Sequence, residues 1–129
     1  MDVEVVEILD AENNVVYFES PAGSSAAVWR GTQEPRPGTY AVELEIPDAV
    51  QSWSLRSSPE ERIVGVEEAG STKASVTGVV ERVDDDSVLV LRLKSDVLLV
   101  EMSEGAPKVA PGDCLTFTVS GLELYPYQL

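Results

Sequence analysis

The sequence contains no histidine and only one cysteine, Cys114. Histidine is the most common general base and metal ligand of proteins, so its absence removes the usual catalytic triads and zinc sites. A single cysteine forms no internal disulfide, and no basic residue stands beside Cys114 to stabilise a thiolate. We therefore interpret Cys114 as structural and predict a non-enzyme with no catalytic residues, no metal and no cofactor. A hydrolase that uses carboxylates alone is the remaining enzymatic alternative.

Long hydrophobic segments are also missing. Apolar runs such as VLVL at 88–91 and VLLV at 97–100 are far shorter than the roughly 20 residues that a membrane-spanning helix needs. The N-terminal stretch MDVEVVEILD is acidic and lacks the basic start of a secretory signal. We expect a cytoplasmic protein that does not contact membranes.

Basic residues are few. The chain carries 9 Lys and Arg against 23 Asp and Glu, which gives a net charge of −14. Residues 1–68 hold 14 of the acids and four of the bases. A negative field repels phosphate backbones and attracts basic surfaces, so a basic protein is the expected partner and nucleic acid is disfavoured. Solubility alone is the plainer explanation of the same charge.

Helical periodicity is nearly absent, whereas strand patterns follow one another with turn residues between them. The clearest strand is TYAVELEI at 39–46, where Tyr40, Val42, Leu44 and Ile46 alternate with acidic or small residues. Alternation with a period of two places one face in a core and the other in water. The 43% apolar content is that of a globular protein. We predict an all-β fold, with one helical turn at most, at 57–62, where Ser58 precedes Pro59.

The two halves of the chain resemble each other. PRPGTYAVELEI at 35–46 returns as VAPGDCLTFTV at 109–119, and equivalent strand residues are 73 apart. The predicted strand VVYFE at 15–19 has its counterpart in VLVLRLK at 88–94. We predict two similar small β-barrel units, 1–70 and 71–129, related by internal duplication. In this scheme residues 62–68 close the first unit and residues 120–129 close the second.

The predicted order is a hairpin, a third strand, a Pro/Gly loop, a fourth strand and a closing strand. This order resembles the oligonucleotide/oligosaccharide-binding (OB) barrel, and Gly78 lies where a long first strand bends. The resemblance implies a small closed barrel and, as an alternative function, binding of single-stranded nucleic acid or oligosaccharide. Such a ligand requires a basic groove, for which the candidates are Arg30, Arg82, Arg92 and Lys94.

Our leading hypothesis is an acidic, non-catalytic interaction module, for example an immunity- or inhibitor-like protein that binds a basic partner. It is expected to be a monomer or a homodimer. The turn at 84–86, DDD, suits either a solvated hairpin or a cation. The predicted partner-binding residues are two acids on the wet face of one strand and three residues in or near loops: Glu43, Glu45, Glu34, Trp53 and Glu67.

Overall fold

The computed structural model describes residues 1–66, 68, 70–84, 87–103 and 109–127, which form β-strands and no helix. The all-β prediction is therefore confirmed, and the helical turn expected at 57–62 is wrong, because these residues form a bend that leads into a strand. None of the described residues belongs to a helix capable of crossing a bilayer. The strands are β1 (Asp2–Asp10), β2 (Val15–Ser20), β3 (Gly23–Trp29), β4 (Gly38–Glu45), β5 (Ser54–Arg56), β6 (Arg62–Gly65), β7 (Ala74–Val83), β8 (Val88–Leu93), β9 (Asp96–Glu101), β10 (Cys114–Val119) and β11 (Glu123–Pro126).

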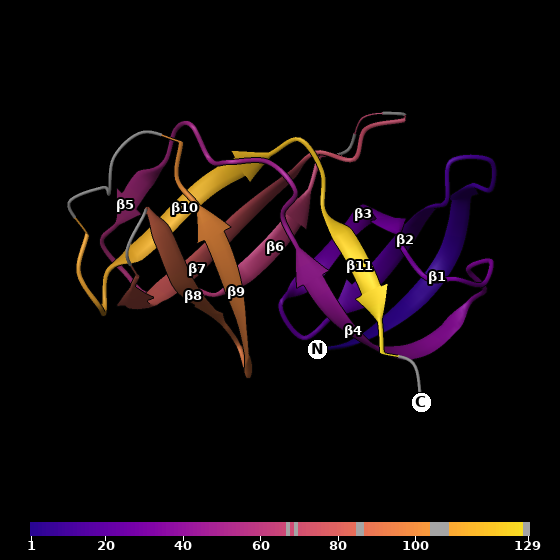
Figure 1. The fold of residues 1–129 in the computed structure, drawn as a ribbon, viewed down its shortest axis with the longest axis horizontal. Helices are drawn as coiled ribbons and strands as arrows, with labels where there is room; N and C mark the ends of the chain where they lie inside the picture. The colour runs from indigo at the N-terminus through magenta and orange to yellow at the C-terminus, as the bar shows by residue number, and fades with distance from the viewer. Residues whose placement is uncertain (67, 69, 85–86, 104–108, 128–129) are drawn as a thin grey trace.

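Strands β1 to β4 and β11 form a closed five-stranded barrel (Figure 1). Strands β1, β2 and β3 pair antiparallel in sequence order, and β4 pairs with the other edge of β1. The barrel closes through β11, which is antiparallel to β4 and parallel to β3. One parallel pair in an otherwise antiparallel five-stranded barrel is consistent with the OB-like architecture.

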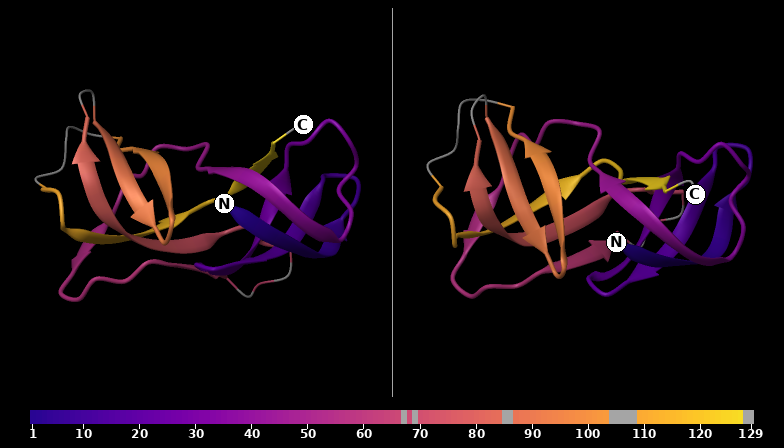
Figure 2. Two further views of the ribbon diagram at one scale, coloured as in Figure 1. Left: turned by 90° about the horizontal axis from the view of Figure 1, so that it is seen from below. Right: turned by 60° about the horizontal axis from the view of Figure 1, so that its bottom comes forward.

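The remaining strands form a second group beside the first barrel (Figure 2). Here β7, β8 and β9 pair antiparallel in sequence order, and β10 pairs with the other edge of β7. Strand β5 is antiparallel to β10, and Val50, a few residues before β5, forms a parallel bridge with Met102. The segment 50–56 thus has the place in the second group that β11 has in the first.

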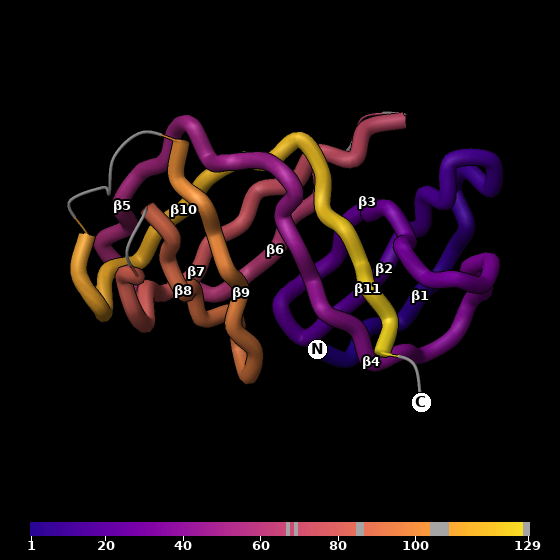
Figure 3. Tube along the Cα trace, viewed as in Figure 1, coloured from indigo at the N-terminus to yellow at the C-terminus, as the bar shows by residue number. Residues whose placement is uncertain are grey.

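The two groups exchange their closing strands. After β4 the chain leaves the first barrel to supply β5 to the second group, and after β10 it returns to supply β11 to the first barrel (Figure 3). The expectation that 62–68 closes the first unit and 120–129 closes the second is therefore wrong. Whether 1–70 and 71–129 are separate domains stays a prediction, although strand pairing crosses that boundary in both directions.

Strand β6 joins the two groups. It pairs antiparallel with β7 and parallel with the start of β3, where Gly23 lies opposite Ile63. At Gly23 φ is +137°, and a Cβ there would overlap the backbone of Ile63, so only glycine allows this approach. The sheet consequently continues from one group into the other.

The two leading hairpins have the same pairing. In β1–β2, Val5 lies opposite Phe18 and a bulge follows; in β7–β8, Val80 lies opposite Leu91 and a bulge follows. The turns end at Asn14 and Ser87, 73 residues apart, each with positive φ. The carbonyl oxygens of these two residues accept hydrogen bonds of 2.8 Å from the amides of Trp29 and Met102, which are also 73 residues apart.

The inward-facing apolar side chains form one hydrophobic cluster that draws on both groups of strands. Strand β11 contributes Leu124 to it, and Leu122 immediately before β11 is likewise fully buried. The strand predicted from its alternation behaves as expected, because Val42 and Leu44 are buried while Glu43 and Glu45 face water. Burial of this apolar surface, at about 25 cal/mol per Å², is the main force that holds the exchanged strands in place.

Candidate functional site

A groove of about 940 Å³ lies between the outer face of the first barrel and the chain from β6 onward. It is built by the end of β1, by β2 and β3, and by residues 63–66. The groove exists because the chain returns from the second group as β6 and lies along the edge of β3. Its position is thus a consequence of the strand exchange.

The floor of the groove combines apolar side chains with polar groups. Val16 and Phe18 of β2 point into the core, so Tyr17 between them points outward and lies opposite Ala26 of β3. Leu9, at the end of β1, is 48% exposed. Its outward direction follows from the bulge in β1, which changes the alternation that holds for Val3 and Val5.

The wall of the groove comes from β6 and the residue that follows it. Ile63 is buried, whereas Val64 and Val66 are 46% and 39% exposed. Gly65 between them lies against Ser25, since a Cβ on this glycine would come within 3.0 Å of the Ser25 Cα. This close passage brings the two valines to the floor strands and leaves apolar surface open to a ligand.

The polar groups of the groove are negative or neutral. The Asp10 carboxylate accepts hydrogen bonds from the Asn13 side chain at 2.8 Å and from the backbone amides of Asn13 and Glu12. The Asn13 side chain and these amides hold the pKa of Asp10 below its ordinary value of 3.8, so the group is ionised at neutral pH. Glu68 adds a second carboxylate, and none of the described residues that line the groove is basic.

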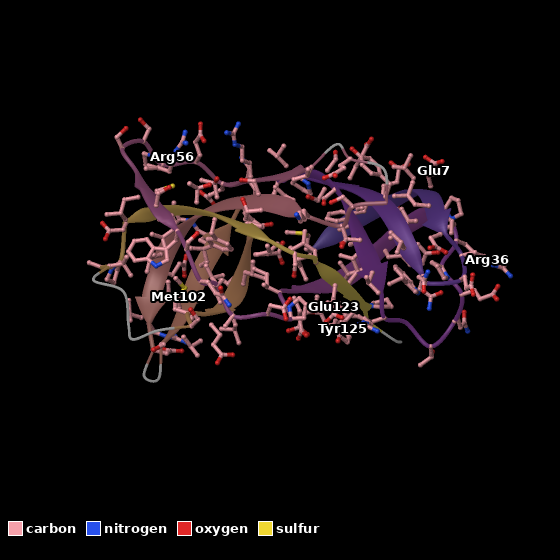
Figure 4. All side chains as sticks on the ribbon, turned by 90° about the horizontal axis from the view of Figure 1, so that it is seen from above. Glu7, Arg36, Arg56, Met102, Glu123 and Tyr125 are labelled. Atoms are coloured by element: carbon pink, nitrogen blue, oxygen red, sulfur yellow. The ribbon has the colours of Figure 1, made fainter. Side chains whose placement is uncertain are left out.

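A second acidic surface lies on β4 and β11. Glu43 is opposite Tyr125 and Glu45 is opposite Glu123. Glu123 is buried, and it accepts a 2.6 Å hydrogen bond from the Arg30 guanidinium and a 3.2 Å one from the Tyr125 hydroxyl. Partial burial, followed by the charge of Glu123, raises the pKa of Tyr125 above its ordinary 10.0. Figure 4 shows Glu123 and Tyr125 side by side.

The predicted partner-binding residues do not gather in one place. Glu43 and Glu45 share the β4 face, and Glu34 is exposed in the loop before β4. Trp53 is half-buried against the core and, with Val50, lines a hollow at the segment that closes the second group. Glu67 lies outside the described residues. Their role in binding stays a prediction, and the structure adds the groove, which does not include any of the four that are described.

Sequence reasoning missed the groove residues for a simple reason. The stretch RIVGVEE has apolar side chains on both faces of one strand, because Ile63 and Val64 are adjacent in sequence and point to opposite sides. A half-wet strand normally carries polar residues on its outer face, so Val64 and Val66 were a signal of a covered or ligand-binding face.

Other reactive groups are in structural positions. Cys114 is buried, and its sulfur atom lies 3.4 Å from the Glu60 amide and 3.5 Å from the Glu60 carbonyl oxygen. Among the described residues no three or more Cys, Asp or Glu side chains converge as a metal site. Asp84 forms an ion pair of 2.6 Å with Arg82, while 85–86 of the acidic turn lie outside the described residues.

Comparison of the chain with protein-family models, with curated proteins and with solved structures found no match.

Proposed function

We propose that the protein is a non-catalytic binding module whose groove holds a basic, partly apolar segment of a partner protein. The observation that carries this function is that exposed apolar side chains, those of Leu9, Val64 and Val66, share one groove with carboxylates and with no described basic residue in the lining. Apolar contacts supply affinity in such a site, and the carboxylates select lysine or arginine at its margin.

The charge balance of the surface supports a basic partner. Most of the described arginines are held by nearby carboxylates, as in the pairs Arg30–Glu123 and Arg82–Asp84. Arg92 lies 3.5 Å from both Glu61 and Glu81. Because these cations are locally neutralised, the excess of 14 negative charges dominates the field that an approaching protein meets. An inhibitor or immunity-like protein that covers a basic enzyme is one concrete form of this function.

The groove is tested by calorimetric titration with a synthetic peptide that alternates arginine and leucine. We expect Leu9→Lys to weaken binding at least about tenfold, because it removes apolar contact and adds a like charge. The matched control is Leu55→Lys, since Leu55 is an exposed leucine of β5 outside the groove. Equal affinities of wild type and Leu9→Lys, or no binding by wild type, would remove the groove as the site.

Steering by the β4 face is a separate part of the same function. Reversal of charge at Glu43 and Glu45 is expected to slow association with the cationic peptide at low salt and to have little effect at high salt. Both side chains are exposed on β4, so the substitutions leave the core intact. Association rates that do not change at low salt would restrict the binding surface to the groove.

Binding of single-stranded nucleic acid or oligosaccharide is the second candidate function. One observation favours it, namely that the groove lies over β2 and β3, the face on which OB barrels bind their ligands. The acidic lining opposes a phosphate backbone, and Arg30, Arg82 and Arg92 are engaged by carboxylates. Titration with a fluorescent single-stranded oligonucleotide distinguishes the two functions, and saturable binding at moderate salt would favour the second.

We also infer that the two strand groups arose by internal duplication. The matching register of the two leading hairpins, the bulge after Val5 and Val80, and the turns that end at Asn14 and Ser87 support this origin. In this interpretation the exchange of closing strands fuses two OB-like units into one body.

A further inference from the structure

The loop between β3 and β4, residues 30–37, is held by side chains of both flanking strands. The Trp29 indole, at the end of β3, donates a 3.1 Å hydrogen bond to the Gln33 carbonyl oxygen. The Tyr40 hydroxyl, in β4, donates a 2.8 Å hydrogen bond to the Arg36 carbonyl oxygen. The two rings also pack edge to face, with their centroids 4.8 Å apart. The backbone of the loop is therefore fixed to the barrel at two points.

Two prolines restrict the part of the loop between these points and β4. Pro35 and Pro37 alternate with Glu34 and Arg36. A proline ring fixes its own φ and also confines the residue before it to extended conformations. All four residues are restricted in this way, so the loop loses little conformational entropy when a partner binds to it.

The Arg36 side chain differs from those of the other arginines. It is exposed, and it forms no ion pair with any carboxylate in the described part of the chain. Figure 4 shows it at the end of the molecule that the first barrel forms. The other five arginines all form ion pairs with described carboxylates: Arg30, Arg56, Arg62, Arg82 and Arg92. In a chain with 14 excess negative charges, Arg36 is thus an arginine whose charge is left for an external anion.

A hollow of about 480 Å³ lies beside Arg36. Its lining includes Trp29, which is buried, and Tyr40, which is half-buried, so Tyr40 supplies the aromatic surface that a ligand can reach. A cation and an aromatic ring consequently border the same hollow. Arginine and tyrosine are among the residues that contribute most to the affinity of protein interfaces.

Glu34 determines which anion fits. It lines the same hollow as Arg36, so the two charges of the site cancel. A phosphate group carries nearly two negative charges at neutral pH and is repelled more strongly by Glu34 than a carboxylate, which carries one. A guanidinium also matches the planar carboxylate, since it donates two parallel hydrogen bonds to it.

We propose that the β3–β4 loop binds an acidic side chain of a partner protein together with an apolar neighbour of that side chain. The carboxylate pairs with the Arg36 guanidinium, and the apolar side chain enters the hollow against Tyr40. This hollow and the groove have no lining residue in common, so the site does not depend on the function proposed for the groove. A basic protein also carries single acidic side chains, and one partner can therefore occupy both sites.

The test uses a leucine–glutamate–leucine peptide that is blocked at both ends, with a leucine–glutamine–leucine peptide as the matched control. Binding is followed by amide chemical shifts in NMR. Because the control lacks only the charge, we expect the glutamate peptide to bind at least about fivefold more tightly, with the largest shifts at Gln33, Glu34 and Arg36. Equal affinities, or no saturable shifts in the loop, would overturn the proposal. Tighter binding of a leucine–phosphoserine–leucine peptide would assign the site to phosphate groups and also overturn it.

Two variants separate the charge of Arg36 from the rigidity of the loop. Arg36→Gln is expected to lower the affinity for the glutamate peptide to that for the control peptide, and Arg82→Gln, at an exposed arginine paired with Asp84, is expected to leave it unchanged. Tyr40→Phe removes the hydroxyl that holds the Arg36 carbonyl oxygen, and we expect it to weaken binding at least about threefold while the preference for glutamate remains.

Three results with these proteins would contradict the proposal. Unchanged affinity in Arg36→Gln would remove the guanidinium as the binding group, and unchanged affinity in Tyr40→Phe would show that a preorganised loop is not required. Loop shifts that grow with protein concentration in the absence of peptide would identify a second copy of the chain as the occupant.

Discussion

Truncation of Leu124 to alanine tests the exchange of strands. Leu124 is fully buried and lies opposite Leu44 of β4 and beside Trp29 of β3, although it is close to the end of the chain. Removal of a buried leucine side chain costs about 2–5 kcal/mol, because apolar contact is lost and a cavity remains. This is a large part of the 5–15 kcal/mol that typically separates folded from unfolded protein. We therefore expect urea denaturation to show the loss and Tm to fall by roughly 10 °C.

Amide hydrogen exchange shows where the damage occurs. The amides of Val28 and Arg30 donate 2.9 Å hydrogen bonds to the carbonyl oxygens of Leu122 and Leu124, so they should exchange faster in Leu124→Ala. If the alanine variant does not fold, the milder Leu124→Val replaces it. Leu99→Ala is the exposed control and is expected to change the free energy of unfolding by less than about 0.5 kcal/mol. Unchanged protection at Val28 and Arg30, with faster exchange in β9 and β10, would refute the exchange.

Three further outcomes follow from local geometry. Asp10→Asn should destabilise the protein at neutral pH, because a carboxyl whose folded-state pKa lies below 3.8 contributes stability above that pH. The difference in stability from wild type should vanish as the pH falls through the folded-state pKa, and urea denaturation at several pH values measures this difference. Glu123→Gln should lower the pKa of Tyr125 toward 10.0. The pKa is read from phenolate absorbance after subtraction of the signal of the Tyr125→Phe variant, and an unchanged pKa would contradict the contact between Glu123 and Tyr125. Gly23→Ala should lower the free energy of unfolding by roughly 2 kcal/mol or more, because the added Cβ meets the β6 backbone. Gly112→Ala is the control, since Gly112 also has positive φ but has open space around it. Equal losses of stability in thermal denaturation would contradict the close crossing of β3 and β6.

The local structure of this protein was predictable from residue patterns. Alternation in β4 correctly placed Val42 and Leu44 in the core and Glu43 and Glu45 in water, since a period of two leaves no other choice when one face is buried. Short polar turns predicted the hairpins because such connections are local.

The partner of each closing strand was not predictable. The sequence around Leu124 has the same alternation whichever barrel it enters, and the pairing is decided by contacts distant in the chain, such as those with Trp29 and Leu44. The groove depends on that exchange, because it is the returning strand that brings Val64 and Val66 into the same groove as Tyr17. Sequence reasoning therefore found the acidic character of the surface but not the place where apolar and acidic groups combine.

The most direct test of the binding function is an NMR titration of the labelled protein with the arginine–leucine peptide. The groove predicts that the largest amide shifts occur at Leu9, Tyr17 and Val64, and that Leu9→Lys removes them. Shifts confined to the β4 and β11 face, or groove shifts caused by a single-stranded oligonucleotide but not by the peptide, would contradict it.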